Sequence, residues 1–204
     1  MNIGVLVSGR GSNLEAVLDH IERGAIRGAE VRVVISNDPN ARALMVAARH
    51  GVKGLVLEQG MSSRKDYDAR IADALQRSGV TPDGGLVLLA GFMRILSKPF
   101  VEMYKGRILN IHPSLLPAFP GLNAQRQALA YGAKVSGCTV HFVVPDVDAG
   151  PVVVQRPVPV KEGDDEEALS ARILRQEHRA YPEAVRLFVE GRLSLEGRKV
   201  RVQR

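Results

Sequence analysis

Short apolar runs and amphipathic stretches alternate along the first half of the chain. A continuous apolar run predicts a strand buried on both faces at residues 3–8, and further apolar stretches predict strands at 31–36, 54–58, 86–90 and 107–112. Apolar residues at helical spacing between these runs predict helices at residues 14–21, 40–51, 62–77 and 97–104. This alternation of strand and helix favours a parallel sheet that is covered by helices on both faces.

The last third of the chain has a different pattern. Apolar runs at 136–144 and 151–160, joined by the loop PDVDAG, predict a strand pair, and the segments 164–181 and 182–191 predict two successive helices. The sequence therefore predicts a single α/β domain over residues 1–204. We expect a Rossmann-like, doubly wound, mostly parallel sheet with an antiparallel strand addition in the C-terminal third.

Composition bears on the partners more than on the fold. The net charge of +6 and the isoelectric point near 9.8 suit nucleic acid, acidic membranes or anionic small molecules. The basic C-terminal segment EGRKVRVQR lacks interleaved aromatic residues, so we interpret it as a solvated edge and expect no nucleic-acid partner. No apolar run approaches the ~20 residues of a membrane span and no signal-peptide pattern is present, so we expect a cytoplasmic protein without membrane association. The single cysteine, Cys138, lies in an apolar run and is predicted to be a core thiol.

The loop SGRGSN, residues 8–13, connects the first predicted strand to the first predicted helix. Glycines permit positive φ and a close approach to a ligand, and Ser12 and Asn13 are good N-cap residues. The start of a helix favours an anion, typically a phosphate. A tight strand–helix turn with a cap is the alternative interpretation. The loop matches neither G-x-G-x-x-G nor the Walker pattern.

An asparagine and a histidine end the fifth predicted strand, in RILNIHPSLLP. Asn110 and His112 are two residues apart and so point to the same face. They lie at the carboxyl end of a parallel strand, where α/β sheets bind ligands. Asparagine can donate to an oxyanion and histidine can move a proton near neutral pH. A satisfied structural histidine is the competing interpretation.

Two further loops carry candidate chemistry. The loop DVDAGP, residues 146–151, holds two carboxylates, which are either a solubilising turn or a source of charge that raises the pKa of a nearby histidine. The segment AGFMRIL, residues 90–96, either lines a pocket for a flat, partly anionic ligand or forms a buried turn. The five histidines lack metal-binding spacing, so no metal site is predicted.

Seven segments occur in the order found in one enzyme family: SGRGSNL, SRKDYD, LAGFMRIL, LNIHPSLLPAFPG, VHFV, DAGP and QEHRAYP. Together they resemble the phosphoribosylglycinamide formyltransferase family of purine (IMP) biosynthesis, over residues 1 to about 192. The resemblance implies transfer of a formyl group from the cosubstrate 10-formyltetrahydrofolate to the amino group of glycinamide ribonucleotide. It implies small-molecule partners, no metal, and a monomer or homodimer.

The resemblance also assigns roles by matching position. Asn110, His112 and Asp148 would be the catalytic trio: Asn110 bonds the formyl oxygen, His112 transfers the proton, and Asp148 keeps His112 protonated. The implied ribonucleotide contacts are Gly11, Ser12, Asn13 and Glu177. The implied formylfolate contacts are Arg64, Phe92, Met93, Arg94, Ile95, Leu96 and Asn110. Residues 1–100 would mainly bind the ribonucleotide phosphate, and residues 101–204 would mainly serve catalysis and folate binding.

The sequence departs from the family pattern in three places. Asn123 stands where the family usually has histidine, and Leu174 where some relatives have a substrate-contacting glutamine. Gly84 and Gly85 are extra residues before the fourth predicted strand, which we interpret as a loop insertion away from the chemistry.

Three other functions are alternatives to this one. Formyltetrahydrofolate hydrolase shares the scaffold, but that family normally has an N-terminal regulatory domain and lacks the GSN loop. Methionyl-tRNA formyltransferase needs a C-terminal RNA-binding domain, for which we expect no room in 204 residues. A non-catalytic folate- or nucleotide-binding regulator is disfavoured by the intact Asn110, His112 and Asp148.

Overall fold

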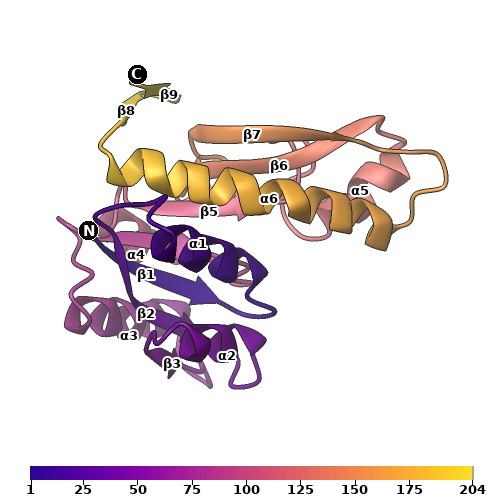
Figure 1. The fold of residues 1–204 in the computed structure, drawn as a ribbon. Coiled ribbons are helices and arrows are strands. Elements are labelled where there is room, and N and C mark those ends of the chain that lie inside the picture. The colour runs from indigo at the N-terminus through magenta and orange to yellow at the C-terminus, as the bar shows by residue number, and fades with distance from the viewer. Residues whose placement is uncertain (204) are drawn as a thin grey trace.

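A computed structural model describes residues 1–203 and contains one seven-stranded sheet with the order β3-β2-β1-β4-β5-β6-β7. The strands are β1 (Asn2–Val7), β2 (Glu30–Ser36), β3 (Gly54–Val56), β4 (Leu86–Leu89), β5 (Ile108–His112), β6 (Val135–Phe142) and β7 (Val152–Pro159). The helices are α1 (Ser12–Glu22), α2 (Arg42–Arg49), α3 (Arg64–Arg77), α4 (Lys98–Met103), α5 (Ala124–Tyr131) and α6 (Glu166–Val189). A separate hairpin, β8 (Leu193–Glu196) and β9 (Lys199–Val202), ends the described chain (Figure 1).

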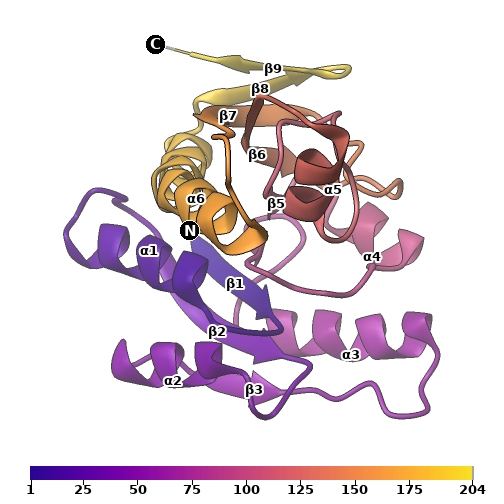
Figure 2. The ribbon, with the colours of Figure 1, turned by 90° about the vertical axis from the view of Figure 1, so that its right-hand side faces the viewer.

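The strand directions confirm the predicted architecture. The first five strands pair in parallel, and β6 and β7 add to β5 in antiparallel register. Parallel strands deliver their carboxyl ends to the same edge of the sheet, so the loops after β1, β2, β4 and β5 lie along that edge. Figures 1 and 2 show this edge running past the start of α1.

Helices cover both faces of the sheet, as the continuous apolar runs required. Along β1, Ile3 and Val5 belong to the core beneath α1, α2 and α6, whereas Leu6 belongs to the core beneath α3 and α4. A strand that is buried on alternate faces in this way has no polar side, which explains its unbroken apolar sequence. Cys138 is fully buried in the first of these cores, so its predicted place is confirmed.

The long C-terminal helix differs from the prediction of two segments. α6 runs through Pro182 without interruption, although an internal proline removes one hydrogen bond and costs ~3 kcal/mol. The buried face continues across this position through Tyr181, Ala184 and Val185. Packing of that continuous face onto the sheet outweighs the local cost of the proline.

Two short elements were not predicted from the sequence. α5 begins after Asn123, which adopts the left-handed conformation with φ of 56°. Asparagine tolerates this conformation better than most residues, so it suits the backbone here. Within the basic C-terminal segment, predicted as a solvated edge, residues 196–202 form the end of β8, the turn at Gly197 and β9 of a hairpin. Both elements are small and depend on neighbours that the local sequence does not reveal.

No helix within residues 1–203 combines the length and the apolar character needed to cross a bilayer.

Candidate active site

Asn110 and His112 lie at the end of β5, where this strand pairs with β6. The antiparallel register places His141 opposite Asn110. Asn110 Nδ2 lies 3.2 Å from His141 Nε2, and His141 Nδ1 lies 2.9 Å from the carbonyl oxygen of Phe142. Because a carbonyl only accepts, His141 carries its proton on Nδ1 and accepts one amide N–H of Asn110 at Nε2. The second amide N–H of Asn110 has no partner within residues 1–203 and can donate to a ligand.

The loop after β6 carries Asp148 to the same place. Asp148 Oδ2 lies 3.4 Å from His112 Nδ1 and accepts a 2.7 Å hydrogen bond from the Gly121 N–H. Asp148 Oδ1 lies 3.7 Å from His141 Nε2. The loop can approach this closely because residue 150 is glycine: a Cβ there would lie 1.7 Å from the carbonyl oxygen at the end of β6. The three predicted catalytic side chains therefore meet in one place, which we call the β5–β6 seam.

His112 stands between two acceptors. Its Nε2 lies 2.9 Å from the carbonyl oxygen of Phe119, so Nε2 carries a proton, and Nδ1 faces the Asp148 carboxylate. Burial lowers the pKa of His112, and this outweighs the upward pull of the Phe119 carbonyl and of Asp148. Asp148 thus acts in the expected direction, but the net shift is opposite to the expected one, because only 5% of His112 is exposed. The lowered pKa favours the neutral form of the imidazole.

Asp148 is the fixed negative charge of the seam. Burial raises the pKa of its carboxyl, but the neighbouring His141, the hydrogen bond from the Gly121 N–H and the charge of His112 together bring that pKa below its ordinary value. The carboxylate is therefore ionised at neutral pH. It can stabilise a proton on His112 Nδ1 without accepting that proton itself.

A pocket of about 490 Å³ opens beside the seam, and most of its lining is apolar. Asn110, His112 and Asp148 line it, together with all five predicted folate residues of the loop after β4: Phe92, Met93, Arg94, Ile95 and Leu96. The side chains of Met93 and Ile95 are largely exposed although they are apolar. An exposed apolar wall at a pocket mouth is typical of a site that is covered by a ligand.

The two predicted folate arginines lie in different places. Arg94 lines the pocket, and its guanidinium lies 5.3 Å from the centre of the Tyr67 ring, within cation–π distance. Arg64 is the exposed first residue of α3 and is not among the residues that line the pocket. Its contact with folate stays a prediction.

The loop between β1 and α1, residues 8–13, forms the second part of the site. Gly11 has φ of 81°, and a Cβ on it would lie 2.6 Å from the Cα of Ala43, so both backbone conformation and space require glycine. α1 starts at Ser12 without a side-chain cap, and its first N–H groups have no main-chain partner within residues 1–203. Such groups suit an anion.

Asn13 and Glu177 meet across the fold. The amide Nδ2 of Asn13 donates a 2.8 Å hydrogen bond to Glu177 Oε2, although the residues are 164 positions apart. Burial raises the pKa of the Glu177 carboxyl, and only 7% of the residue is exposed. The structure thus joins two of the four predicted ribonucleotide residues directly. Their contact with a substrate stays a prediction.

Sequence reasoning missed several residues of the site. His141, which orients Asn110, was seen only as part of the VHFV segment, and the pocket wall formed by residues 143–147 was not assigned. A signal was present: in CTVHF, the polar residues Thr139 and His141 alternate with apolar ones, which places them on one face of a strand. Without the register, that face had no known partner.

One group of possible metal ligands occurs within residues 1–203, away from this site. It comprises Asp19, Glu22 and His50, whose ligand atoms lie within 4.8 Å of one another. His50 Nδ1 is 2.6 Å from Glu22 Oε1, and Asp19 is paired with Arg23 at 3.0 Å. These ion pairs account for the cluster.

The fold is an α/β domain with a mostly parallel sheet, and the seam gathers an amide, two histidines and a carboxylate beside a pocket. The family model described as "Formyl transferase" matches residues 1–185. The Escherichia coli phosphoribosylglycinamide formyltransferase is 45% identical over 196 residues, which cover 96% of this chain and 90% of the relative. The chain therefore belongs to the formyl transferase family and, within it, to the phosphoribosylglycinamide formyltransferases.

Other comparisons agree. The Drosophila melanogaster "Trifunctional purine biosynthetic protein adenosine-3" is 47% identical over 93% of this chain, which spans only 14% of that protein's length. The crystal structure of glycinamide ribonucleotide transformylase 1 from Symbiobacterium toebii has a TM-score of 0.95 and 54% identity, covering 100% of this chain and 94% of that one. A formyltetrahydrofolate deformylase from Pseudomonas syringae has a TM-score of 0.89 at 23% identity, covering 100% of this chain and 66% of that one, which shows a shared fold.

Proposed function

We propose that this protein transfers the formyl group of 10-formyltetrahydrofolate to the amino group of glycinamide ribonucleotide. The products are formylglycinamide ribonucleotide and tetrahydrofolate, in de novo purine biosynthesis. The observation that carries the proposal is the meeting of Asn110, His112 and Asp148 beside an apolar pocket of about 490 Å³. The proposal is supported by the names of relatives that match this chain over most of its length.

The two substrates fit the two parts of the site. The flat, apolar part of formyltetrahydrofolate suits the pocket walls formed by residues 92–96 and 143–147. The phosphate of the ribonucleotide suits the free N–H groups at Gly11, Ser12 and Asn13. Both parts of the site use both halves of the chain. The folate pocket has walls from residues 92–96 and 143–147, and Glu177 contacts Asn13 at the phosphate end. Within that arrangement, residues 1–100 mainly bind phosphate and residues 101–204 mainly carry catalysis and the folate pocket.

The chemistry follows from the seam. The amine nitrogen attacks the formyl carbon, and the carbonyl electrons move onto oxygen, where the free N–H of Asn110 stabilises the negative charge. The attacking nitrogen becomes positively charged and gives a proton to His112. His112 then protonates the departing folate nitrogen as the carbon–nitrogen bond breaks and the oxyanion collapses to a carbonyl. Asp148 holds the imidazolium that exists between these two transfers.

The lowered pKa of His112 fits this sequence of events. A neutral imidazole can receive the amine proton, whereas an imidazolium present from the start would have no capacity for it. The nearby carboxylate makes the protonated form accessible for the second transfer. The role assigned to His112 is therefore that of a proton shuttle.

An absorbance assay of tetrahydrofolate formation tests the proposed function. With both substrates present, we expect formation of the folate product to depend on glycinamide ribonucleotide and to saturate with it. Product formation at the same rate without the ribonucleotide would identify a hydrolase on the same scaffold instead.

The predicted cytoplasmic location and the monomer or homodimer state are separate proposals, and light scattering of the purified protein tests the oligomeric state.

A further inference from the structure

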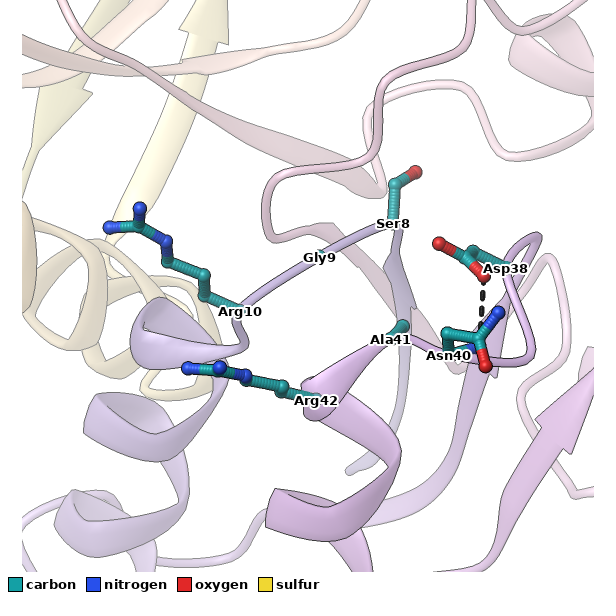
Figure 3. Close-up of a pocket in the computed structure, with 7 residues that line it drawn as sticks. All are labelled: Ser8, Gly9, Arg10, Asp38, Asn40, Ala41 and Arg42. Carbon is teal, nitrogen blue, oxygen red and sulfur yellow. Dashed lines mark hydrogen bonds between the residues drawn. The ribbon is translucent and has the colours of Figure 1, made fainter.

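A second hollow lies beside the loop 8–13, outside the residues assigned to the ribonucleotide. Its volume is about 380 Å³, and it is lined by Ser8, Gly9, Arg10, Asp38, Asn40, Ala41 and Arg42 (Figure 3). These residues come from the loop between β1 and α1 and from the loop between β2 and α2, and Arg42 is the first residue of α2. We call it the arginine hollow, because two of its lining side chains are arginines that the proposed chemistry does not use.

The two arginines lie on one side of this hollow. Figure 3 shows Arg42 extending from the start of α2 toward the first turn of α1, and Arg10 extending outward from the turn just before α1, while Asp38 and Asn40 lie on the other side. Neither guanidinium has a hydrogen-bond or ion-pair partner within residues 1–203. The carboxylate of Asp38 is turned to its own loop, where Oδ1 accepts a 2.8 Å hydrogen bond from the Asn40 N–H.

The backbones of both arginines lie next to residues that hold the loop 8–13 in place. Arg10 immediately precedes Gly11, and Arg42 immediately precedes Ala43. Ala43 donates its N–H to the Gly9 carbonyl at 3.0 Å and approaches Gly11 so closely that no Cβ fits between them. These contacts hold the loop and the start of α2 together, and the two arginine side chains leave from either side of this junction.

We propose that Arg10 and Arg42 form a cationic clasp for the phosphate monoester of the ribonucleotide. This inference rests on the proposed function, because it extends the same phosphate site. A phosphate monoester carries about −1.5 to −2 charges at pH 7, and the loop N–H groups are neutral. Two guanidinium groups match that charge and present paired N–H donors to phosphate oxygens. The clasp makes the protein select a phosphorylated substrate over the corresponding nucleoside.

Exposure of the arginines is consistent with this role. An exposed pair of unpartnered cations beside a binding loop attracts an anionic substrate before contact and closes on it afterwards. A buried pair would be inaccessible to a substrate that arrives from water. Asp38, on the opposite side, repels an anion and leaves the arginine side as the favourable place for phosphate.

Steady-state kinetics with Arg10→Gln, Arg42→Gln and the double variant test the clasp. We expect the KM for glycinamide ribonucleotide to rise about tenfold in each single variant and about a hundredfold in the double variant, with kcat nearly unchanged. Inorganic phosphate should inhibit the wild-type protein in competition with the ribonucleotide, and the double variant should lose this inhibition. Arg42→Lys should recover part of the affinity, since it keeps the charge and loses the paired donors.

The matched control is the double variant Arg77→Gln and Arg201→Gln, which removes the same charge from exposed ion pairs elsewhere. It should keep the KM and the phosphate inhibition of the wild type. An unchanged KM and unchanged phosphate inhibition in the Arg10 and Arg42 double variant would overturn the clasp, as would an equal effect in the control.

Failure of the proposed function would look different. If the wild type formed no product with glycinamide ribonucleotide, calorimetry with inorganic phosphate would still report on the clasp. Binding that disappears in the double variant and persists in the control supports the clasp. Equal binding by all three proteins contradicts it.

Discussion

The β5–β6 seam and the arginine hollow differ in how far their side chains are exposed to water. The seam consists of side chains that are nearly excluded from water: His112 and His141 expose 5% and 2% of their surface. The hollow is lined by two loops with polar side chains and by two exposed arginines. Proton transfer needs a histidine whose pKa is set by its surroundings, and burial supplies that setting. Capture of a charged substrate needs groups that water and substrate can reach.

The comparison predicts that changes at the seam alter kcat and changes at the phosphate end alter KM. The largest effect is expected for Asp148→Asn. The substitution removes the charge that stabilises protonated His112 and retains an oxygen that can accept the Gly121 N–H, so the fold is kept. We expect kcat to fall by about 10³-fold or more with a near-normal circular dichroism spectrum.

Asp83→Asn serves as the control, because Asp83 is an exposed acid in the turn before β4. It should retain wild-type kcat. Near-normal turnover of Asp148→Asn would contradict the role given to this carboxylate.

A smaller loss of kcat is expected for Asn110→Ala. The variant lacks the N–H that faces the pocket, and oxyanion donors of this kind contribute about 10²–10³-fold to kcat. The KM for the ribonucleotide should change little, because the loop 8–13 is untouched. Rapid-quench measurement of the rate of formyl transfer checks the expected loss in the chemical step. A large rise in KM with normal kcat would place Asn110 in substrate binding instead.

Gly11→Ala should have the opposite signature. The new Cβ meets the backbone of Ala43 at 2.6 Å, and residue 11 must hold φ of 81°. We expect a loss of about 1–3 kcal/mol in the free energy of unfolding and a KM for the ribonucleotide raised at least tenfold. Gly84→Ala is the matched control, since its nearest neighbour is 3.6 Å away. Chemical denaturation and steady-state kinetics of the two variants decide the matter, and equal behaviour would remove the special role of Gly11.

The smallest effect concerns the pH dependence of stability. The pKa of His112 in the folded protein lies below its ordinary value of 6.5, so the unfolded chain binds the proton first as pH falls. The free energy of unfolding should therefore rise with pH between the lowered pKa and 6.5. His178 has a lowered pKa too, so His112→Gln should reduce this slope without abolishing it. Urea denaturation across this pH range gives the slopes, and an unchanged slope in the variant would contradict the burial effect.

Much of the fold followed from the sequence because β1, β4 and β5 are largely buried on both faces. A run such as IGVLVS has one structural solution in an α/β protein, and its β1 position is observed. Elements held by distant contacts were harder. The continuity of α6 through Pro182 depends on packing of Tyr181 and Val185 against the sheet, which no local pattern reveals.

The residues of the site also divide into those predicted from local sequence and those that depend on distant contacts. The spacing of Asn110 and His112 placed them on one face, and the predicted strand pair placed Asp148 in the connecting loop. The partner of Asn110 depends on which residue of β6 lies opposite, and a register is not encoded locally, so His141 was missed. The net pKa shift of His112 was also inaccessible, because burial, which decides its direction, is a property of the folded chain.

The most direct measurement of the central claim follows the formyl carbon itself. The protein is mixed with 10-formyltetrahydrofolate that carries a ¹³C label in the formyl group and with glycinamide ribonucleotide, and the products are separated by mass spectrometry. The account predicts that the label appears in formylglycinamide ribonucleotide, in step with tetrahydrofolate, and that Asp148→Asn slows this transfer severely. Label released as formate, at a rate that ignores the ribonucleotide, would contradict the account.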